Sequence, residues 1–72
     1  MLERDIFAAN VRRLREERGW TQEQLAEAAD LHLDHISKIE NRHREPRVRT
    51  ISKLAKGLGV GAGPLFEEID GQ

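Results

Sequence analysis

Apolar residues recur at helical spacing in two groups between Trp20 and Asn41, with polar residues between them. The pattern predicts two short helices joined by a tight turn around Asp30. Such a pair cannot bury its apolar stripe alone, so helices before and after it must complete the core. The predicted inward-facing set is Leu25, Ala26, Ala29, Leu31, Ile36 and Ile39.

The chain offers a helix ahead of this pair. Apolar side chains fall at helical spacing over residues 6–18, and Gly19 follows in the position where a left-handed residue commonly ends a helix. Charged residues occupy the other side, where arginines can balance glutamates. The predicted inward-facing residues are Ile6, Phe7, Asn10, Val11 and Leu14.

The two central helices have start signals of unequal strength. Thr21 with Gln24 matches a capping box, in which a hydroxyl and a side-chain amide satisfy free backbone N–H groups, and it predicts a helix over residues 22–28. The next helix is predicted over residues 33–40, with His32 as a poor N-cap.

An exposed loop follows, because residues 41–46 contain no apolar side chain and end in proline. A fourth helix is predicted over residues 47–58, closed by Gly59. Gly57 lies in its last turn and costs about 1 kcal/mol relative to alanine, so this end either frays or packs closely.

A short fifth helix is predicted over residues 64–69, with Pro64 suited to its first position. Its apolar edge of Leu65, Phe66 and Ile69 has little chain left to cover it, and is the predicted contact of a homodimer. We therefore expect an all-α, compact five-helix domain, a single domain over residues 1–72 with its core over about 6–69.

Composition narrows the protein class. The 72 residues include no cysteine, which excludes a disulfide framework and a thiolate zinc site and fits a cytoplasmic location. The start of the chain lacks the apolar core of a signal peptide, and no run approaches membrane-spanning length. We expect a soluble protein with no membrane partner.

Charge is unevenly distributed, although the net charge is only −1. Residues 38–56 hold seven basic and two acidic side chains, whereas residues 1–37 hold five basic and eight acidic ones and residues 57–72 hold three acids and no base. Such polarity directs a basic face toward an anionic partner, unless the face is merely solvated.

The motifs in this order and spacing resemble the Cro and phage-repressor type of helix-turn-helix domain, the Xre family, over about residues 6–66. The lambda-repressor-like fold is what this resemblance implies. The matching residues are Arg13, Leu14, Arg15, Gly19, the run 21–26, the run 36–40, Pro46, Ile51, Leu54, Ala55, Leu58, Gly59, Val60, Leu65 and Phe66.

The resemblance implies that residues 33–40 form a recognition helix in the DNA major groove. Its expected base-reading residues are Leu33, Asp34, Ser37 and Lys38, bordered by His35. Lysine can donate to guanine, aspartate can accept from the cytosine amino group, and leucine can pack on a thymine methyl. The expected contacts to the DNA backbone are Thr21, Gln22, His32, Asn41, Arg42, Arg44 and Arg47.

Three residues depart from the family pattern. Asp30 occupies the turn position that usually holds glycine, and aspartate tolerates the left-handed conformation better than most residues. His32 replaces the usual serine or threonine cap. Asp34 brings a negative charge toward DNA, so it must pair with a cytosine amino group or a nearby arginine, or point away.

Other interpretations of the candidate residues have less support from the sequence. An enzyme is not expected, because Ser37 and Ser52 have no base and orienting group and no phosphate-binding loop is present. His32 and His35 could in principle hold a metal, but they lack a suitable third ligand, and no metal or cofactor is predicted. Trp20 is expected to be core and helix staple, not a base-stacking platform.

The resemblance implies a sequence-specific transcriptional regulator that binds a palindromic operator as a homodimer. It is similar to the controller proteins of restriction-modification systems, which suggests control by protein concentration with no small-molecule effector. Glu23 and Glu27 are candidates for a contact with RNA polymerase. The alternative is an antitoxin-like protein-interaction module, which would need an extended tail that this chain lacks.

Overall fold

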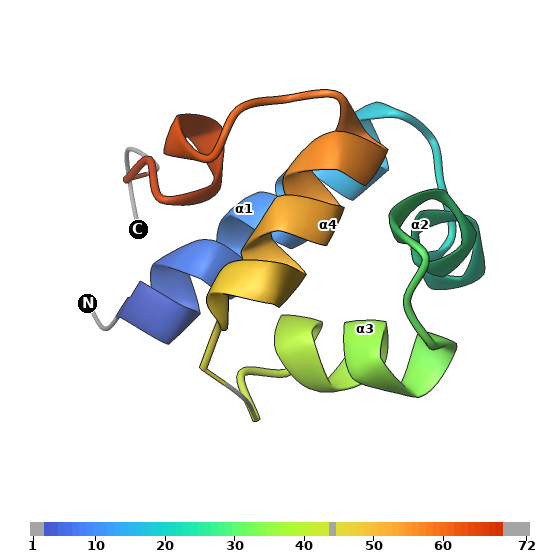
Figure 1. Ribbon diagram of the computed structural model, residues 1–72, viewed down its shortest axis with the longest axis horizontal. Helices are drawn as coiled ribbons and strands as arrows, with labels where there is room; N and C mark the ends of the chain where they lie inside the picture. The colour runs from blue at the N-terminus through green and yellow to red at the C-terminus, as the bar shows by residue number, and fades with distance from the viewer. Residues whose placement is uncertain (1–2, 44, 69–72) are drawn as a thin grey trace.

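The computed structural model describes residues 3–43 and 45–68, and this part of the chain is helical with no strand. Figure 1 shows α4 crossing in front of α1, with α2 and α3 to one side and the 3-10 turn η1 near the chain's end. The elements are α1 (Glu3–Glu17), α2 (Gln22–Ala29), α3 (Leu33–Glu40), α4 (Val48–Leu58) and η1 (Gly63–Leu65).

The all-helical prediction is confirmed, but the predicted fifth helix is wrong. Only a single 3-10 turn forms after α4, and Ile69 lies outside the described residues. Asn10 of α1 is fully buried, and its Nδ2 donates to the carbonyl oxygens of Leu65 at 3.1 Å and Glu67 at 2.6 Å. The bond to Leu65 occupies a carbonyl group that the predicted helix would use for its own hydrogen bond. Phe66 also packs against Phe7, with ring centroids 5.4 Å apart.

The bounds predicted for α3 are confirmed, and those of the other helices differ from the prediction by one to three residues. The first helix begins at Glu3 and ends at Glu17, where residues 6–18 were predicted. Both α2 and α4 differ by one residue at one end. Such differences are ordinary at helix ends, which lack half of their hydrogen bonds.

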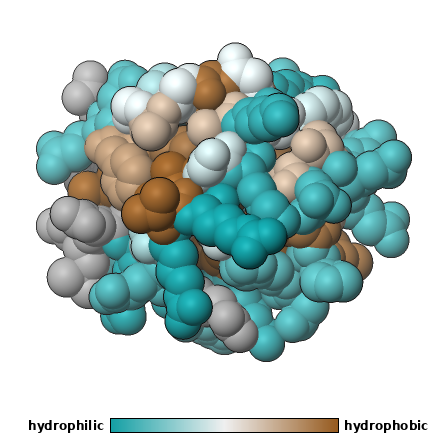
Figure 2. All heavy atoms as spheres, in the orientation of Figure 1, coloured by the Kyte–Doolittle hydropathy of each residue, from teal (hydrophilic) through white to brown (hydrophobic). Residues whose placement is uncertain are grey.

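The core lies between α1, α4 and the α2–α3 pair. The predicted inward-facing residues of α2 and α3 are buried, except that Leu31 packs against the core while partly exposed. Trp20 also packs against the core, as predicted. On the face shown in Figure 2, polar atoms cover most of the surface, and apolar atoms gather over the first half of α4 and toward η1. None of the described helices is long and apolar enough to cross a membrane.

All four α-helices are followed by a residue in the left-handed conformation: Gly19, Asp30, Arg42 and Gly59, with φ from 55° to 72°. The predicted tolerance of Asp30 at the turn is confirmed, at φ 55° and ψ 48°. In each case the next backbone N–H donates to a carbonyl five residues earlier, which closes the helix end. These bonds are Trp20 to Arg15 at 3.1 Å, and Leu31 to Ala26, His43 to Lys38 and Val60 to Ala55, each at 2.9 Å.

Gly57 allows α4 to lie directly against α2. A Cβ atom on this residue would fall 2.8 Å from the Cα of Ala29 and 2.9 Å from the carbonyl carbon and oxygen of Ala28. These are backbone atoms, which cannot swing aside as the end of a long side chain can. Of the two expectations for this helix end, close packing is the one observed.

We expect Gly57→Ala to lower the free energy of unfolding by about 1–3 kcal/mol, because the added methyl group overpacks the α2–α4 contact. Urea denaturation measures the change. Lys56→Ala, at the preceding and exposed position of the same helix, serves as the control and should shift stability by at most about 0.5 kcal/mol. A gain of about 1 kcal/mol for Gly57→Ala, the value expected from helix propensity alone, would contradict this account.

Candidate nucleic-acid interface

Helix α3 buries one face and presents the other to solvent. Ile36 and Ile39 lie in the core, whereas Leu33 at the start of the helix is 43% exposed. The side chains predicted to read bases all reach this outer face, some exposed and some half-buried. Four of them, Leu33, Asp34, His35 and Lys38, line a hollow together with His32.

The acidic residue on this face has a basic partner on its own helix. The Nζ of Lys38 lies 3.0 Å from Oδ2 of Asp34, one turn earlier. The sequence suggested a cytosine amino group or an arginine as the partner of Asp34, whereas the structure places Lys38 beside it. The expected weakness of the α3 cap is confirmed, since the His32 side chain makes no capping hydrogen bond.

A buried ion pair fixes α3 against α1. Arg15 donates from Nε to Oε2 of Glu40 at 2.7 Å and from Nη2 to Oε1 at 2.9 Å. The two side chains are only 12% and 4% exposed. These hydrogen bonds raise the pKa of Arg15 above its ordinary value, so the guanidinium stays charged.

The same carboxylate also holds a predicted phosphate contact. The Nε2 of Gln22, at the start of α2, donates to Oε1 of Glu40 at 3.2 Å, and Arg15 donates to the carbonyl of Trp20 at 2.7 Å. This network joins α1, α2 and α3 at one point. Arg15, Gln22 and Glu40 all belong to the sequence motifs, but the motifs do not predict that they contact one another. The expected partner of Arg15 was a glutamate on its own helix, and the observed partner lies 25 positions away.

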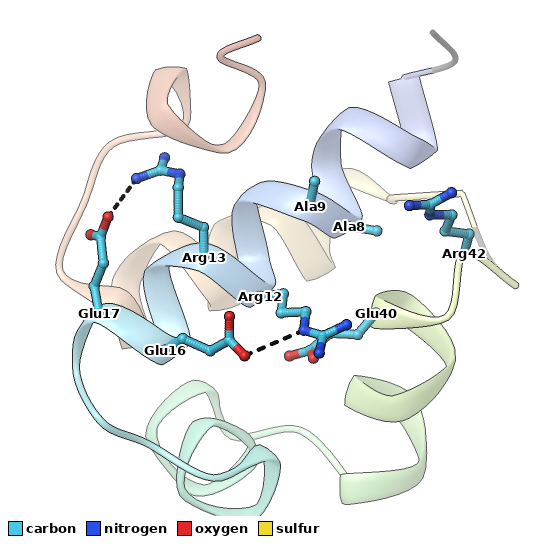
Figure 3. A pocket seen from close by; sticks show the side chains of 8 residues that line it. All are labelled: Ala8, Ala9, Arg12, Arg13, Glu16, Glu17, Glu40 and Arg42. Carbon is cyan, nitrogen blue, oxygen red and sulfur yellow. Dashed lines mark hydrogen bonds and ion pairs between the residues drawn. The ribbon is translucent and has the colours of Figure 1, made fainter. Parts of the chain in front are cut away.

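Arg12 and Arg13 pair with glutamates of α1, as expected. Arg12 lies 3.4 Å from Glu16, and Arg13 lies 2.9 Å from Glu17, both one turn apart on α1. Figure 3 shows these pairs beside a hollow between α1 and the end of α3, with Arg42 at its far edge. The pairing leaves the hollow with mixed charge.

The remaining predicted backbone contacts lie around α2 and the loop after α3. The capping box is confirmed, with Thr21 Oγ1 accepting from the Gln24 N–H at 3.1 Å and Gln24 Oε1 accepting from the Thr21 N–H at 2.8 Å. Asn41 and Arg47 are exposed, the latter as the N-cap of α4. Arg44 lies outside the described residues.

Arg42 combines an exposed cation with a backbone conformation that favours glycine. Its φ is 65°, and its side chain is 61% exposed, with Nε 3.9 Å from Oδ1 of Asp5. For a residue with a Cβ atom this conformation costs roughly 1–2 kcal/mol. Backbone strain of this kind is concentrated at functional sites.

His32 and His35, the two candidate metal ligands, lie on this surface. Across residues 3–43 and 45–68 there is no group of three or more His, Cys, Asp or Glu side chains that could hold a metal ion. The His32 and His35 pair therefore has no third ligand among the described residues.

Comparisons with known proteins agree on one family. A family model described as helix-turn-helix matches residues 11–65. An uncharacterised HTH-type transcriptional regulator of Sinorhizobium fredii is 37% identical over 67 residues, which cover 93% of this chain and 87% of the relative. The control protein C.SmaI of Serratia marcescens is also 37% identical, over 63 residues that cover 88% of this chain and 75% of that protein.

A solved structure shows the same architecture. The restriction-modification controller protein C.AhdI from Aeromonas hydrophila superposes with a TM-score of 0.83 at 30% identity, covering 88% of this chain and 96% of that one. The matched region includes the α2–α3 unit and the helices that support it. The chain belongs to the Xre-type helix-turn-helix family of DNA-binding transcriptional regulators.

Proposed function

We propose that this chain binds a specific palindromic operator as a homodimer, with α3 of each protomer in the major groove. The observation that carries the proposal is that α3 is held in place with one face exposed to solvent. Its predicted base-reading residues reach solvent, while the opposite face is buried and its last residue is held by Arg15. The proposed base-reading residues are Leu33, Asp34, His35, Ser37 and Lys38.

Backbone contacts are proposed for the surfaces on either side of α3. The amide groups at the start of α2 favour an anion, and Gln22 lies beside them. On the other side, Arg47 and Arg49 form no ion pair with another described residue, so their charges are open to phosphate. The proposed set is Thr21, Gln22, His32, Asn41, Arg42, Arg44 and Arg47, and Arg49 extends it.

The dimer contact is proposed near the end of the chain. Leu65 is fully buried within one protomer, so it acts by holding the neighbouring Phe66, which is partly exposed. Val48 at the start of α4 is 83% exposed, and the apolar surface over this half of α4 continues toward η1 (Figure 2). Two-fold symmetry then places the operator half-sites about 34 Å apart.

One relative is named as a control protein and one solved structure as a restriction-modification controller protein, and both support a controller role for this chain. Such a role needs only the DNA-binding surface and a dimer contact. We therefore propose regulation through protein concentration, in the cytoplasm and without a small-molecule effector.

Selection of random duplex DNA with the purified protein tests the function. We expect an enriched palindromic motif, with affinity that falls as salt rises by a log–log slope of about −0.9 per phosphate contact. Binding titrations on the enriched duplex and on a scrambled one measure specificity and slope. Equal, weak and salt-sensitive binding to both duplexes would overturn sequence-specific recognition.

Arg42→Gly separates the fold from DNA binding. We expect the variant to be more stable by about 1 kcal/mol, because glycine adopts the left-handed conformation without strain. It should nevertheless bind the operator more weakly, with the salt slope reduced in magnitude by about 1. Denaturation and salt titration measure the two effects.

Asp30→Gly is the matched control for Arg42→Gly. It relieves the same left-handed conformation at a position outside the proposed contacts. It should keep the wild-type salt slope. An unchanged slope in Arg42→Gly as well would exclude Arg42 from the phosphate contacts.

Val48→Asp tests the dimer contact without disturbing the core, since Val48 is largely exposed. We expect sedimentation at micromolar concentration to show a monomer, because a carboxylate would be buried without a partner. Val48→Leu keeps the surface apolar and should remain dimeric. A dimeric Val48→Asp with native circular dichroism would place the interface elsewhere.

A further inference from the structure

The ion pair on the outer face of α3 contributes little to the stability of the fold. Its side chains are 76% exposed at Asp34 and 41% exposed at Lys38, and exposed pairs one helical turn apart contribute little to stability. Both residues line the hollow at the start of the proposed recognition helix. A negative charge in the first turn of α3 is favourable to the helix dipole, but it weakens the attraction to DNA.

We infer that Asp34 and Lys38 act as one unit that selects a G·C base pair by the order of its donor and acceptor groups. This inference rests on the proposed insertion of α3 into the major groove. The unit presents a donor, Nζ, and an acceptor, Oδ2, 3.0 Å apart.

The edge of a G·C pair carries the complementary groups at the same spacing. Guanine O6 accepts and cytosine N4 donates, and these two atoms are hydrogen-bonded to each other, which sets them about 2.9 Å apart. Lys38 can therefore donate to O6 while Asp34 accepts from N4, and their mutual contact is kept. Guanine N7 offers the ammonium group of Lys38 a second acceptor.

The polarity of the unit makes it selective. Inverting the base pair to C·G places the cytosine amino group against Lys38 and the guanine acceptors against Asp34, so donors face donors and acceptors face acceptors. An A·T pair presents the same inverted order. A T·A pair has the matching order but lacks the second acceptor and places a methyl group beside O4.

Asp34 then acts mainly by rejecting wrong sequences. At a mismatched site its carboxylate is removed from water without a donor, which is costly. Loss of the carboxylate should therefore strengthen binding to unrelated DNA while it weakens discrimination. Lys38, in contrast, contributes both affinity and discrimination.

Selection of random duplex DNA is carried out with the wild type, Asp34→Ala, Lys38→Ala and the double variant. We expect the wild type to prefer G·C over C·G at one position of each half-site by about tenfold. Both single variants should lose that preference at the same position, and the double variant should lose no more than either single one. Asp34→Ala should also bind a scrambled duplex more tightly than the wild type does.

Glu17→Gln is the matched control, since it also removes one negative charge from an ion pair one helical turn apart, but on α1. It should bind all duplexes slightly more tightly and keep the G·C preference. If the single variants alter different positions, or their effects add, the two residues do not act as a unit and the inference is overturned. A wild-type motif that all variants retain overturns the inference alone, whereas the absence of any wild-type motif overturns the proposed function with it.

Discussion

The buried ion pair between Arg15 and Glu40 sets the geometry on which the proposed DNA-binding surface depends. It joins the first helix of the domain to the last residue of α3, and the same carboxylate holds Gln22 at the start of α2. Removing two charges from water is costly, and a buried pair often adds little net stability compared with apolar packing. The pair contributes geometric specificity, because its two parallel hydrogen bonds fix the end of α3 relative to α1. The same carboxylate also fixes the side chain of Gln22.

Such a constraint matters because α3 is a weak helix by itself. It has eight residues, a histidine N-cap without a capping bond, and a left-handed residue beyond each end, at Asp30 and Arg42. Helices of this length are not stable alone in water. The burial of Ile36 and Ile39 and the anchor at Glu40 therefore determine where α3 lies.

The sequence predicted what local chemistry determines. Helical spacing identified the four α-helices, and Thr21 with Gln24 marked the start of α2 because a capping box is complete within four residues. Local patterns could not exclude the predicted fifth helix, because the hydrogen bond to the Leu65 carbonyl comes from Asn10, which lies 55 positions earlier in the chain. The role of Gly57 likewise depends on the backbone of α2. The sequence alone could not decide whether this end of α4 frays or packs closely.

For the candidate interface, too, the sequence predicted the features that depend on local spacing. Periodicity placed the outer residues of α3 correctly because Ile36 and Ile39 define the buried face, but the partners of charged side chains depend on rotamers and on distant helices. Those partners also reconcile a net charge of −1 with binding to a polyanion. Glu16, Glu17 and Glu40 are paired with arginines, whereas Arg47 and Arg49 have no ionic partner among the described residues. Because a paired acid repels phosphate far less than an isolated one, the net charge of the chain does not by itself measure how this surface interacts with DNA.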